Sequence, residues 1–445
     1  MTDQRSIKKV SSFLEKNSMT ADRIDMETGV RMFREEMTAG LSGTGSSLQM
    51  IPTYISAEGD IPRDKPVLVL DAGGTNFRTA SVFIDRTGEP HIEQFKKYEM
   101  PGSKSYVDKT LFFNTIVDYM KELLEGWKDG EKPHIGFCFS YPTEIYPNKD
   151  GRLLHFSKEI KAPEVEGELI GENLTRALVK RGYSEPGQLV LLNDTVATLL
   201  AGKAVSAGPN FDSFTGFILG TGTNSAYIET NENIKKLGRT RSSGSQIINM
   251  ESGNLNRIAG GSIDTAFDAT TKRPGYYRFE KMVSGAYLGP LAGMVLMEAV
   301  EAGLFSPQAS AALSEVMDFN TVTVDNFLHK PADPDNPVAS ACSRSEDRTT
   351  AYILMDNIIE RAAKLAAINI SAMVLQDGGG SDPSRPTAVC ADGTTFYKTR
   401  DLLFRTRCYL KEYLEGRHTR YVKLIHQNDA PIIGSAVAAL LSMRG

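Results

Sequence analysis

Short apolar runs and longer stretches with helical spacing alternate along the chain. The short runs, bounded by glycine or polar residues, predict strands at 67–70, 79–84, 134–140, 188–192, 214–219, 225–228, 387–391 and 422–425. Apolar positions with helical spacing predict helices up to about residue 40, at 110–125, from about Asp194, at 280–303, at 349–375 and at 434–442. Strands and helices are therefore interspersed over the whole chain.

Two of the predicted strand pairs repeat one layout. In VLVLDAGGTNFRTASVFI (67–84) and FILGTGTNSAYIE (217–229), an apolar strand is followed by a turn ending in Gly-Thr-Asn and by a second apolar strand. A strand after the turn argues against a dinucleotide fingerprint, and no Gly-Lys-Ser or Gly-Lys-Thr follows to make a Walker A loop. The repeat predicts two related lobes that each open with a β-hairpin, although so short a repeat also arises by chance.

The first turn contains the groups that a phosphate or metal site requires. Asp71 ends a strand, where its carboxylate could hold Mg²⁺ directly or through water. Glycines let the backbone approach a ligand, and N–H groups with the Thr75 hydroxyl could donate to phosphate oxygens. The second turn carries Leu219 at the position that matches Asp71. An ordinary hairpin explains either turn alone, whereas the two together favour a nucleotide gripped between lobes.

Further polar residues stand where strands and helices begin or end. Asn193 and Asp194 suit an ordinary N-cap as well as a general base aimed at a ligand. Lys158 would steady a transferred phosphoryl group or bind sugar, but a lone lysine is more often a surface residue. Glu251 and Glu280 would accept hydrogen bonds from neighbouring hydroxyls, whereas a glutamate at a helix start often only complements the helix dipole.

Composition narrows the class of protein. The 445 residues are 41% hydrophobic and 24% charged, as in soluble globular proteins, and a net charge of −5 lowers the expectation of nucleic-acid binding. The four cysteines form no CxxC pair, so neither a disulfide framework nor a zinc site is expected. No signal peptide or membrane span is predicted, and a reducing cytoplasm is the expected location.

The order of the motifs is more specific than any one of them. The chain contains, in the order seen in hexokinases and eukaryotic-type glucokinases, SSLQMIPTYI, LDAGGTNFR, GFCFSYP, FSKEIKAPEVEGE, LLNDTVATLLAG, GFILGTGTNSAYIE, INMESG, FEKMVSGAYLG, CADGTTFYK and GSAVAAL. It thus resembles the hexokinase family from about residue 25 to the C-terminus, at the length of a single-unit hexokinase. The resemblance implies an α/β, two-lobed, actin-like (ribonuclease-H-like) sugar kinase fold with a central cleft.

The resemblance also implies a division of the chain. The small lobe would span 66–192 with the C-terminal helix 436–445, and would contain the first phosphate hairpin and part of the sugar site. The large lobe would span 1–65 and 193–435, and would contain the second hairpin, the sugar-binding glutamates and the adenosine side.

Residue roles follow from the same resemblance. It implies Asp194 as the catalytic base, Lys158 as a second catalytic residue and Asp71 as the metal-binding carboxylate. The implied sugar-binding residues are Ser140, Ser157, Lys158, Asn193, Asp194, Asn224, Glu251 and Glu280. The implied nucleotide-binding residues are Asp71, Gly73, Gly74, Thr75, Asn76, Gly220, Thr221, Gly222, Asp392, Gly393, Gly434 and Ser435.

One segment departs from the family pattern. Where the family has an acidic residue followed by Gly-Ser-Gly, this chain has Asp429, Ala430 and Pro431. The proline removes an N–H and the serine hydroxyl is lost. The departure puts nucleotide affinity, or selectivity among phosphoryl donors, in doubt. The loop 376–386, rich in Gly, Asp and Pro, is also unusual for the family.

The sequence therefore predicts an ATP- and Mg²⁺-dependent kinase that phosphorylates the 6-hydroxyl of a hexose, glucose being the first expectation, at the entry to glycolysis. The alternatives are a kinase for mannose, fructose or an amino sugar, a catalytically weak hexose sensor, and an actin-like or chaperone-like ATPase. The expected partners are the hexose and ATP, without nucleic acid or membrane. The expected assembly is a monomer or homodimer.

Overall fold

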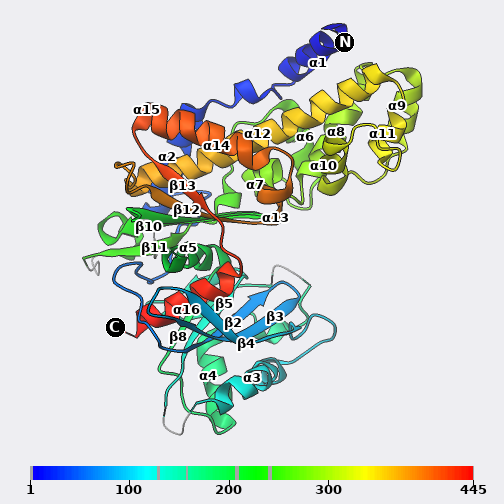
Figure 1. The fold of residues 1–445 in the computed structure, drawn as a ribbon. Coiled ribbons are helices and arrows are strands. Elements are labelled where there is room, and N and C mark those ends of the chain that lie inside the picture. Colours follow the sequence, from blue (N-terminus) through cyan, green and yellow to red (C-terminus); the bar gives the residue numbers. More distant parts are fainter. Residues whose placement is uncertain (1–3, 128–130, 157–158, 206–209, 239–242, 444–445) are drawn as a thin grey trace.

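The computed structural model describes residues 4–127, 131–156, 159–205, 210–238 and 243–443, which form two lobes that are each built on one sheet (Figure 1). One sheet has the strand order β4-β3-β2-β5-β8 and the other β1-β11-β10-β9-β12-β13, and β6 pairs with β7 alone. The strands are β1 (Ile51–Pro52), β2 (Val67–Gly73), β3 (Asn76–Ile84), β4 (Pro90–Glu99), β5 (His134–Phe139), β6 (Thr143–Ile145), β7 (Gly151–Leu153), β8 (Gln188–Leu192), β9 (Ser213–Leu219), β10 (Thr223–Thr230), β11 (Ser245–Asn249), β12 (Thr387–Asp392) and β13 (Val422–Ile425).

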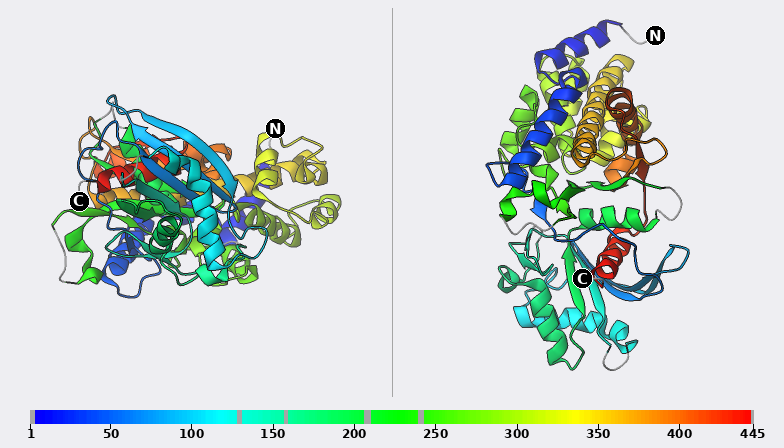
Figure 2. Two further views of the ribbon diagram at one scale, coloured as in Figure 1. Left: turned by 90° about the horizontal axis from the view of Figure 1, so that it is seen from below. Right: turned by 90° about the vertical axis from the view of Figure 1, so that its left-hand side faces the viewer.

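Helices form most of the lobe with the six-stranded sheet, and α1 lies at the end of the molecule opposite the five-stranded sheet (Figure 2). None of the described helices is both long and apolar enough to cross a membrane. The helices are α1 (Gln4–Lys16), α2 (Met26–Ser42), α3 (Lys109–Glu125), α4 (Ile170–Lys180), α5 (Asp194–Val205), α6 (Ser262–Thr270), α7 (Arg278–Val283), α8 (Leu288–Glu301), α9 (Pro307–Ser314), α10 (Thr321–His329), α11 (Pro337–Ala341), α12 (Ser345–Asp377), α13 (Thr394–Lys398), α14 (Leu402–Leu410), α15 (Gly416–His418) and α16 (Ala430–Ser442).

The two sheets share one topology. In the first, β4, β3 and β2 are antiparallel neighbours, and β5 and β8 continue parallel to β2. In the second, β11, β10 and β9 are antiparallel neighbours, and β12 and β13 continue parallel to β9. The repeated hairpins that the sequence predicts are β2–β3 and β9–β10. The predicted internal repeat is therefore confirmed at the level of the whole sheet.

Two helices, α5 and α16, lie between the sheets and pack against each other (Figure 1). Helix α5 contacts β9, and α16 contacts β5 and β2. The helices approach closely because their contacts are made by small residues. A methyl group on Gly434 would lie 1.8 Å from the carbonyl oxygen of Ala197, and one on Gly136 of β5 would lie 2.0 Å from that of Ser435. The two lobes are therefore joined by a close helix crossing that only small residues allow.

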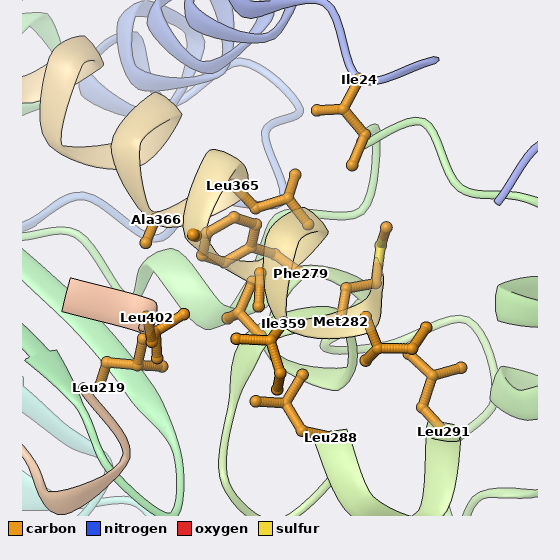
Figure 3. Close-up of a cluster of buried hydrophobic side chains, with 14 of the residues drawn as sticks. Ile24, Leu219, Phe279, Met282, Leu288, Leu291, Ile359, Leu365, Ala366 and Leu402 are labelled. Atoms are coloured by element: carbon orange, nitrogen blue, oxygen red, sulfur yellow. The ribbon is translucent and has the colours of Figure 1, made fainter. Parts of the chain in front are cut away.

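The largest core surrounds α12, which runs through the middle of the helical lobe. Figure 3 shows Phe279 and Met282 of α7 and Leu288 of α8 gathered with Ile359 and Leu365 of α12. All five side chains are buried. This apolar packing fixes α7 relative to α12, and α7 carries one of the predicted site glutamates.

Most predicted elements are confirmed to within a few residues, including β5, β8, α3 and α12. The opening helical region is two helices, α1 and α2, and the last helix begins at Ala430. The single helix predicted at 280–303 is wrong, because the chain breaks it into α7 and α8. At the break, the N–H groups of Gly285 and Ala286 donate to the carbonyls of Gly220 and Thr221 at 2.8 and 3.0 Å.

Candidate active site

The junction of β8 and α5 brings Asn193 and Asp194 between the lobes. Asn193 Oδ1 accepts a hydrogen bond from the Thr195 N–H at 2.9 Å, so this side chain does cap the helix. Asp194 is the first residue of α5. Burial raises the pKa of both Asp71 and Glu251, and the negative charge of Asp194 raises each further. The charge of Asp194 therefore acts on two carboxylates from distant parts of the sequence.

An amide–carboxylate network lies beside this junction. Asn224 Nδ2 lies 2.9 Å from Asn249 Oδ1, 3.3 Å from Asn193 Oδ1 and 3.4 Å from Glu251 Oε1. Asn249 Nδ2 in turn donates to Glu251 Oε1 at 2.9 Å. Sequence reasoning missed Asn249, although it lies within the INMESG motif, because its place at the end of an apolar strand suits a core residue. The network ties together three of the predicted sugar-binding residues.

Glu251 has an unfavourable backbone conformation and a carboxylate that is difficult to ionise. Its φ of 55° lies in the left-handed region, which non-glycine residues rarely adopt. Burial raises its pKa, the hydrogen bond from Asn249 opposes this rise, and the charges of Asp194 and Glu280 add to it. Backbone strain and a carboxylate that is costly to ionise are typical of a functional site.

Glu280 of α7 contacts the second turn. Its Oε2 accepts a hydrogen bond from the Thr223 N–H at 3.0 Å. Two glycines make room for this carboxylate, because a methyl group would lie 2.7 Å from Oε2 at Gly222 and 3.2 Å at Gly253. Burial raises the pKa of Glu280, and the Thr223 N–H lowers it. The second predicted sugar-binding glutamate thus lies beside the predicted phosphate turn.

The first turn is built around an ion pair between the buried Asp71 and the partly exposed Arg78. Asp71 Oδ2 accepts from Arg78 Nη1 at 2.9 Å, and the Asp71 side chain is 5% exposed. Burial raises the pKa of Asp71, and the positive charge of Arg78 opposes the rise. Gly74 has a φ of 69°, and its carbonyl accepts from the Tyr141 hydroxyl at 2.6 Å. The Ser140 N–H donates to the Ala72 carbonyl, which brings Ser140 to the same edge.

The second turn contacts the segment after β12. The Gly220 carbonyl accepts from the Gly285 N–H and from the Thr395 hydroxyl, each at 2.8 Å. Gly393 has a φ of 113°, and a methyl group there would lie 2.2 Å from the Leu219 carbonyl oxygen, so this position requires glycine. The predicted adenosine-side turn is therefore adjacent to the predicted phosphate turn. Sequence reasoning missed Gly285 and Thr395, which are remote from the turn in sequence.

Four predicted site residues are not placed at these turns. Ser157 and Lys158 lie outside the described residues. Gly434 and Ser435, which the resemblance assigns to the nucleotide, are both buried in the packing of α16, and that assignment stays a prediction. Gly434 packs against α5, and the Ser435 hydroxyl donates to the Pro431 carbonyl at 2.7 Å. A Gly-Ser pair suits close helix packing as well as ligand binding.

Pro431 itself lies in the first turn of α16. A proline is tolerated there because the N–H that it lacks would have no partner within the helix. The segment is therefore compatible with the helix, and its effect on the choice of phosphoryl donor stays a prediction.

The chain is similar to known proteins over nearly its whole length. Two family models described as hexokinase match residues 9–204 and 214–441. Hexokinase-1 of Schizosaccharomyces pombe is 28% identical over 93% of this chain and 87% of its own, and Hexokinase-9 of Oryza sativa subsp. japonica is 30% identical over 91% and 84%. The structure of a Schistosoma mansoni hexokinase complexed with glucose is similar, with a TM-score of 0.77, 26% identity, and coverage of 99% of this chain and 100% of the other.

Proposed function

This chain belongs to the hexokinase family of ATP-dependent hexose kinases, and on that premise we propose that it transfers the γ-phosphoryl group of ATP to the 6-hydroxyl of a hexose, with glucose as the preferred acceptor. The observation that most supports the proposal is the hydrogen-bonded network of Asn193, Asn224 and Glu251, which joins the start of α5 to the six-stranded sheet beside Asp194. An ATPase without a sugar substrate would have no need for the amide network around Glu251.

Asp194 is proposed as the group that receives the proton of the 6-hydroxyl. A carboxylate is a weak base, so the proton moves late, and the main work of Asp194 is to orient the hydroxyl oxygen toward the phosphorus. Phosphoryl transfer depends chiefly on such positioning and on neutralising charge. The start of α5 is a rigid support for this purpose, because α5 is packed against α16.

The remaining hydroxyls of the sugar are proposed to meet Asn193, Asn224, Glu251 and Glu280. Amides both donate and accept, whereas an ionised carboxylate accepts two or more hydrogen bonds. A hydrogen bond to a charged group contributes about 1.5–3 kcal/mol. Buried polar groups left unpaired by a wrong epimer cost similar amounts, so this set can discriminate between hexoses.

Asp71 fits the protein side of a Mg²⁺ site. Its Oδ2 is used by Arg78, and its Oδ1 lies toward Gly73 in the turn. The described residues contain no cluster of three metal-ligating side chains, which agrees with an ion that keeps water and phosphate oxygens as most of its ligands. When bound, Mg²⁺ would neutralise phosphate charge. The N–H groups of both turns would add to this neutralisation.

We also propose that residues 66–192 with the C-terminal helix act as the small lobe, and that the lobes close on the sugar. The proposed site is shared. Asp71 lies in the five-stranded sheet and Ser140 directly follows its strand β5, whereas Asn224 lies in the six-stranded sheet and Glu251 follows its strand β11. A ligand that binds both sides favours the closed arrangement by its differential affinity for it. Closure would exclude water from the phosphoryl group.

The proposal is tested by a matrix of sugars and phosphoryl donors. Glucose, mannose, fructose and N-acetylglucosamine are each combined with ATP and GTP, and the phosphorylated sugar is identified by mass spectrometry. The expected result is glucose 6-phosphate as the product with the highest kcat/KM, and ADP formation that depends on hexose. Sugar-independent ATP hydrolysis would instead favour an ATPase, and tight sugar binding without product would favour a sensor.

A further inference from the structure

A fully buried polar cluster lies behind the proposed sugar site. It consists of Ser225 of β10, Ser252 after β11 and Asn369 of α12, none of which has any exposed surface. The two serine Oγ atoms lie 2.9 Å apart. Asn369 Nδ2 donates to Ser225 Oγ at 2.7 Å and lies 3.3 Å from Ser252 Oγ. One amide on the central helix thus joins two separate segments of the sheet.

Each serine directly follows a proposed sugar-binding residue. Ser225 follows Asn224, and Ser252 follows Glu251. The Asn224 side chain also binds this backbone, because its Oδ1 accepts from the Ser225 N–H at 2.7 Å and from the Ser252 N–H at 3.3 Å. The position of Asn224 relative to Glu251 is therefore set by the same two residues that Asn369 holds together.

This cluster lowers the stability of the folded protein. Asn369 lies in a stretch of α12 that is otherwise almost wholly apolar and buried, and its Oδ1 has no hydrogen-bond partner within the described part of the protein. A buried acceptor without a partner destabilises the folded state, and an apolar residue of similar size would avoid that cost. Buried polar networks do, however, fix one arrangement of the segments that they connect.

The segment that contains Glu251 and Ser252 has a backbone conformation that its surroundings must hold in place. Glu251 adopts a left-handed backbone conformation with a φ of 55° immediately before Ser252. Its surroundings must impose this conformation, because an isolated chain would rarely adopt it. The contact of Asn369 with Ser252 anchors the residue that follows the strained one.

We propose that Asn369 is a positioning residue for the hexose site, which sets the distance between Asn224 and Glu251 through Ser225 and Ser252. The inference rests on the proposed function, since it takes those two residues as sugar ligands. Asn369 itself is too deeply buried to touch the sugar. Its loss should therefore weaken hexose binding and epimer discrimination, while the nucleotide side is unaffected.

The test compares Asn369→Ala with Ser371→Ala. Ser371 is an equally buried residue two positions further along α12, and its hydroxyl has no hydrogen-bond partner among the described residues, so it controls for polar loss in the same core. Glucose binding is measured by calorimetry without ATP, together with kcat, the KM values and the melting temperature. Asn369→Ala should raise the glucose Kd about 10-fold and leave the ATP KM within about twofold. Ser371→Ala should change neither.

A double-mutant cycle separates positioning from general destabilisation. If the cluster acts as a unit, Ser252→Ala should weaken glucose binding, and the double variant with Asn369→Ala should lose little more than Asn369→Ala alone. Ser225→Ala and Ser252→Ala also carry the test should Asn369→Ala fail to fold. Glucose Kd values within twofold of the wild type in the folded variants would overturn the inference but leave the function intact. A wild-type protein that binds no hexose would overturn the proposed function itself.

Discussion

At the residue scale, Glu251 has features that lower the stability of the folded protein but suit the proposed binding of sugar hydroxyls. It is half-buried, its backbone is strained, and the negative charges of Asp194 and Glu280 act on it. Its pKa is raised mainly because burial removes water from the ionised form. Folding therefore disfavours the charged carboxylate, although the charged form is the better acceptor for sugar hydroxyls.

Replacing Glu251 by glutamine should make the ligand-free protein more stable at about pH 8 and weaken glucose binding at least 10-fold. A folded-state pKa above the ordinary value means that the stability contributed by this group is present at low pH and is lost as the pH rises through that pKa. Glutamine carries no charge and keeps an acceptor for Asn249. Thermal unfolding should show a gain in melting temperature that shrinks toward about pH 5, and a variant less stable than the wild type at about pH 8 would refute this view.

At the scale of elements, the crossing of α5 and α16 supports the side chains that we propose to be catalytic. Asp194 begins α5, and α16 contacts both that helix and the sheet that carries Asp71. The crossing depends on Gly434, whose Cα lies against the backbone of Ala197. Protein interiors are close-packed, so an added methyl group must displace one of the two helices.

Gly434→Ala is therefore expected to lower the free energy of unfolding by about 1–3 kcal/mol. Gly416→Ala is a matched control, because Gly416 is an exposed helical residue with a φ of −72° and ordinary space around its Cα. That change should stabilise the protein by about 0.4–1 kcal/mol, since alanine restricts the unfolded chain. Urea denaturation of both variants measures the difference. Equal effects would show that the helix crossing tolerates a side chain.

Elements also show where local sequence patterns fail. Most strands of the two sheets, including β2, β5 and β8, could be predicted, because burial imposes an apolar pattern on them. Strand β4 was not predicted, because many of its side chains are exposed and leave no apolar run. The break between α7 and α8 could not be predicted, because it is made by hydrogen bonds from Gly285 and Ala286 to a turn far away in sequence. Asn249 was missed for a related reason: at the end of a buried strand, a ligand-facing amide and a core residue occur in the same pattern.

At the scale of the whole molecule, the repeat covers complete sheets. The two short motifs predicted the two hairpins but not the strands that continue each sheet. Asp71, Asp194, Asn224, Glu251 and Glu280 were all predicted from motifs, and the structure brings them together. The motif around Gly434 and Ser435 does not show that the helix starts four residues earlier, at Ala430, or that both residues are buried. Whether such residues are buried depends on contacts between elements that are distant in sequence, and a linear motif does not show those contacts.

Lobe closure makes a prediction at the same scale. Small-angle X-ray scattering should give a smaller radius of gyration when glucose is added, because a sugar that contacts both lobes draws them together. L-glucose is the matched control, since it has the same composition but the wrong hand for the hydrogen-bonding groups, and it should cause no change. An unchanged radius with saturating D-glucose would mean that the sugar binds without closing the lobes.

The central claim is that Asp194 acts on a hexose bound between the lobes, and Asp194→Ala tests it most directly. Glucose Kd by calorimetry and kcat by coupled ADP formation are measured on the same preparation. Asp108→Ala serves as the control, because Asp108 caps α3 with a 2.7 Å hydrogen bond from the Leu111 N–H, so its loss should cost about 1 kcal/mol of stability and no activity. The account predicts that Asp194→Ala binds glucose within about threefold of the wild type while kcat falls by about 10²–10⁴. Near-normal turnover of Asp194→Ala would contradict it.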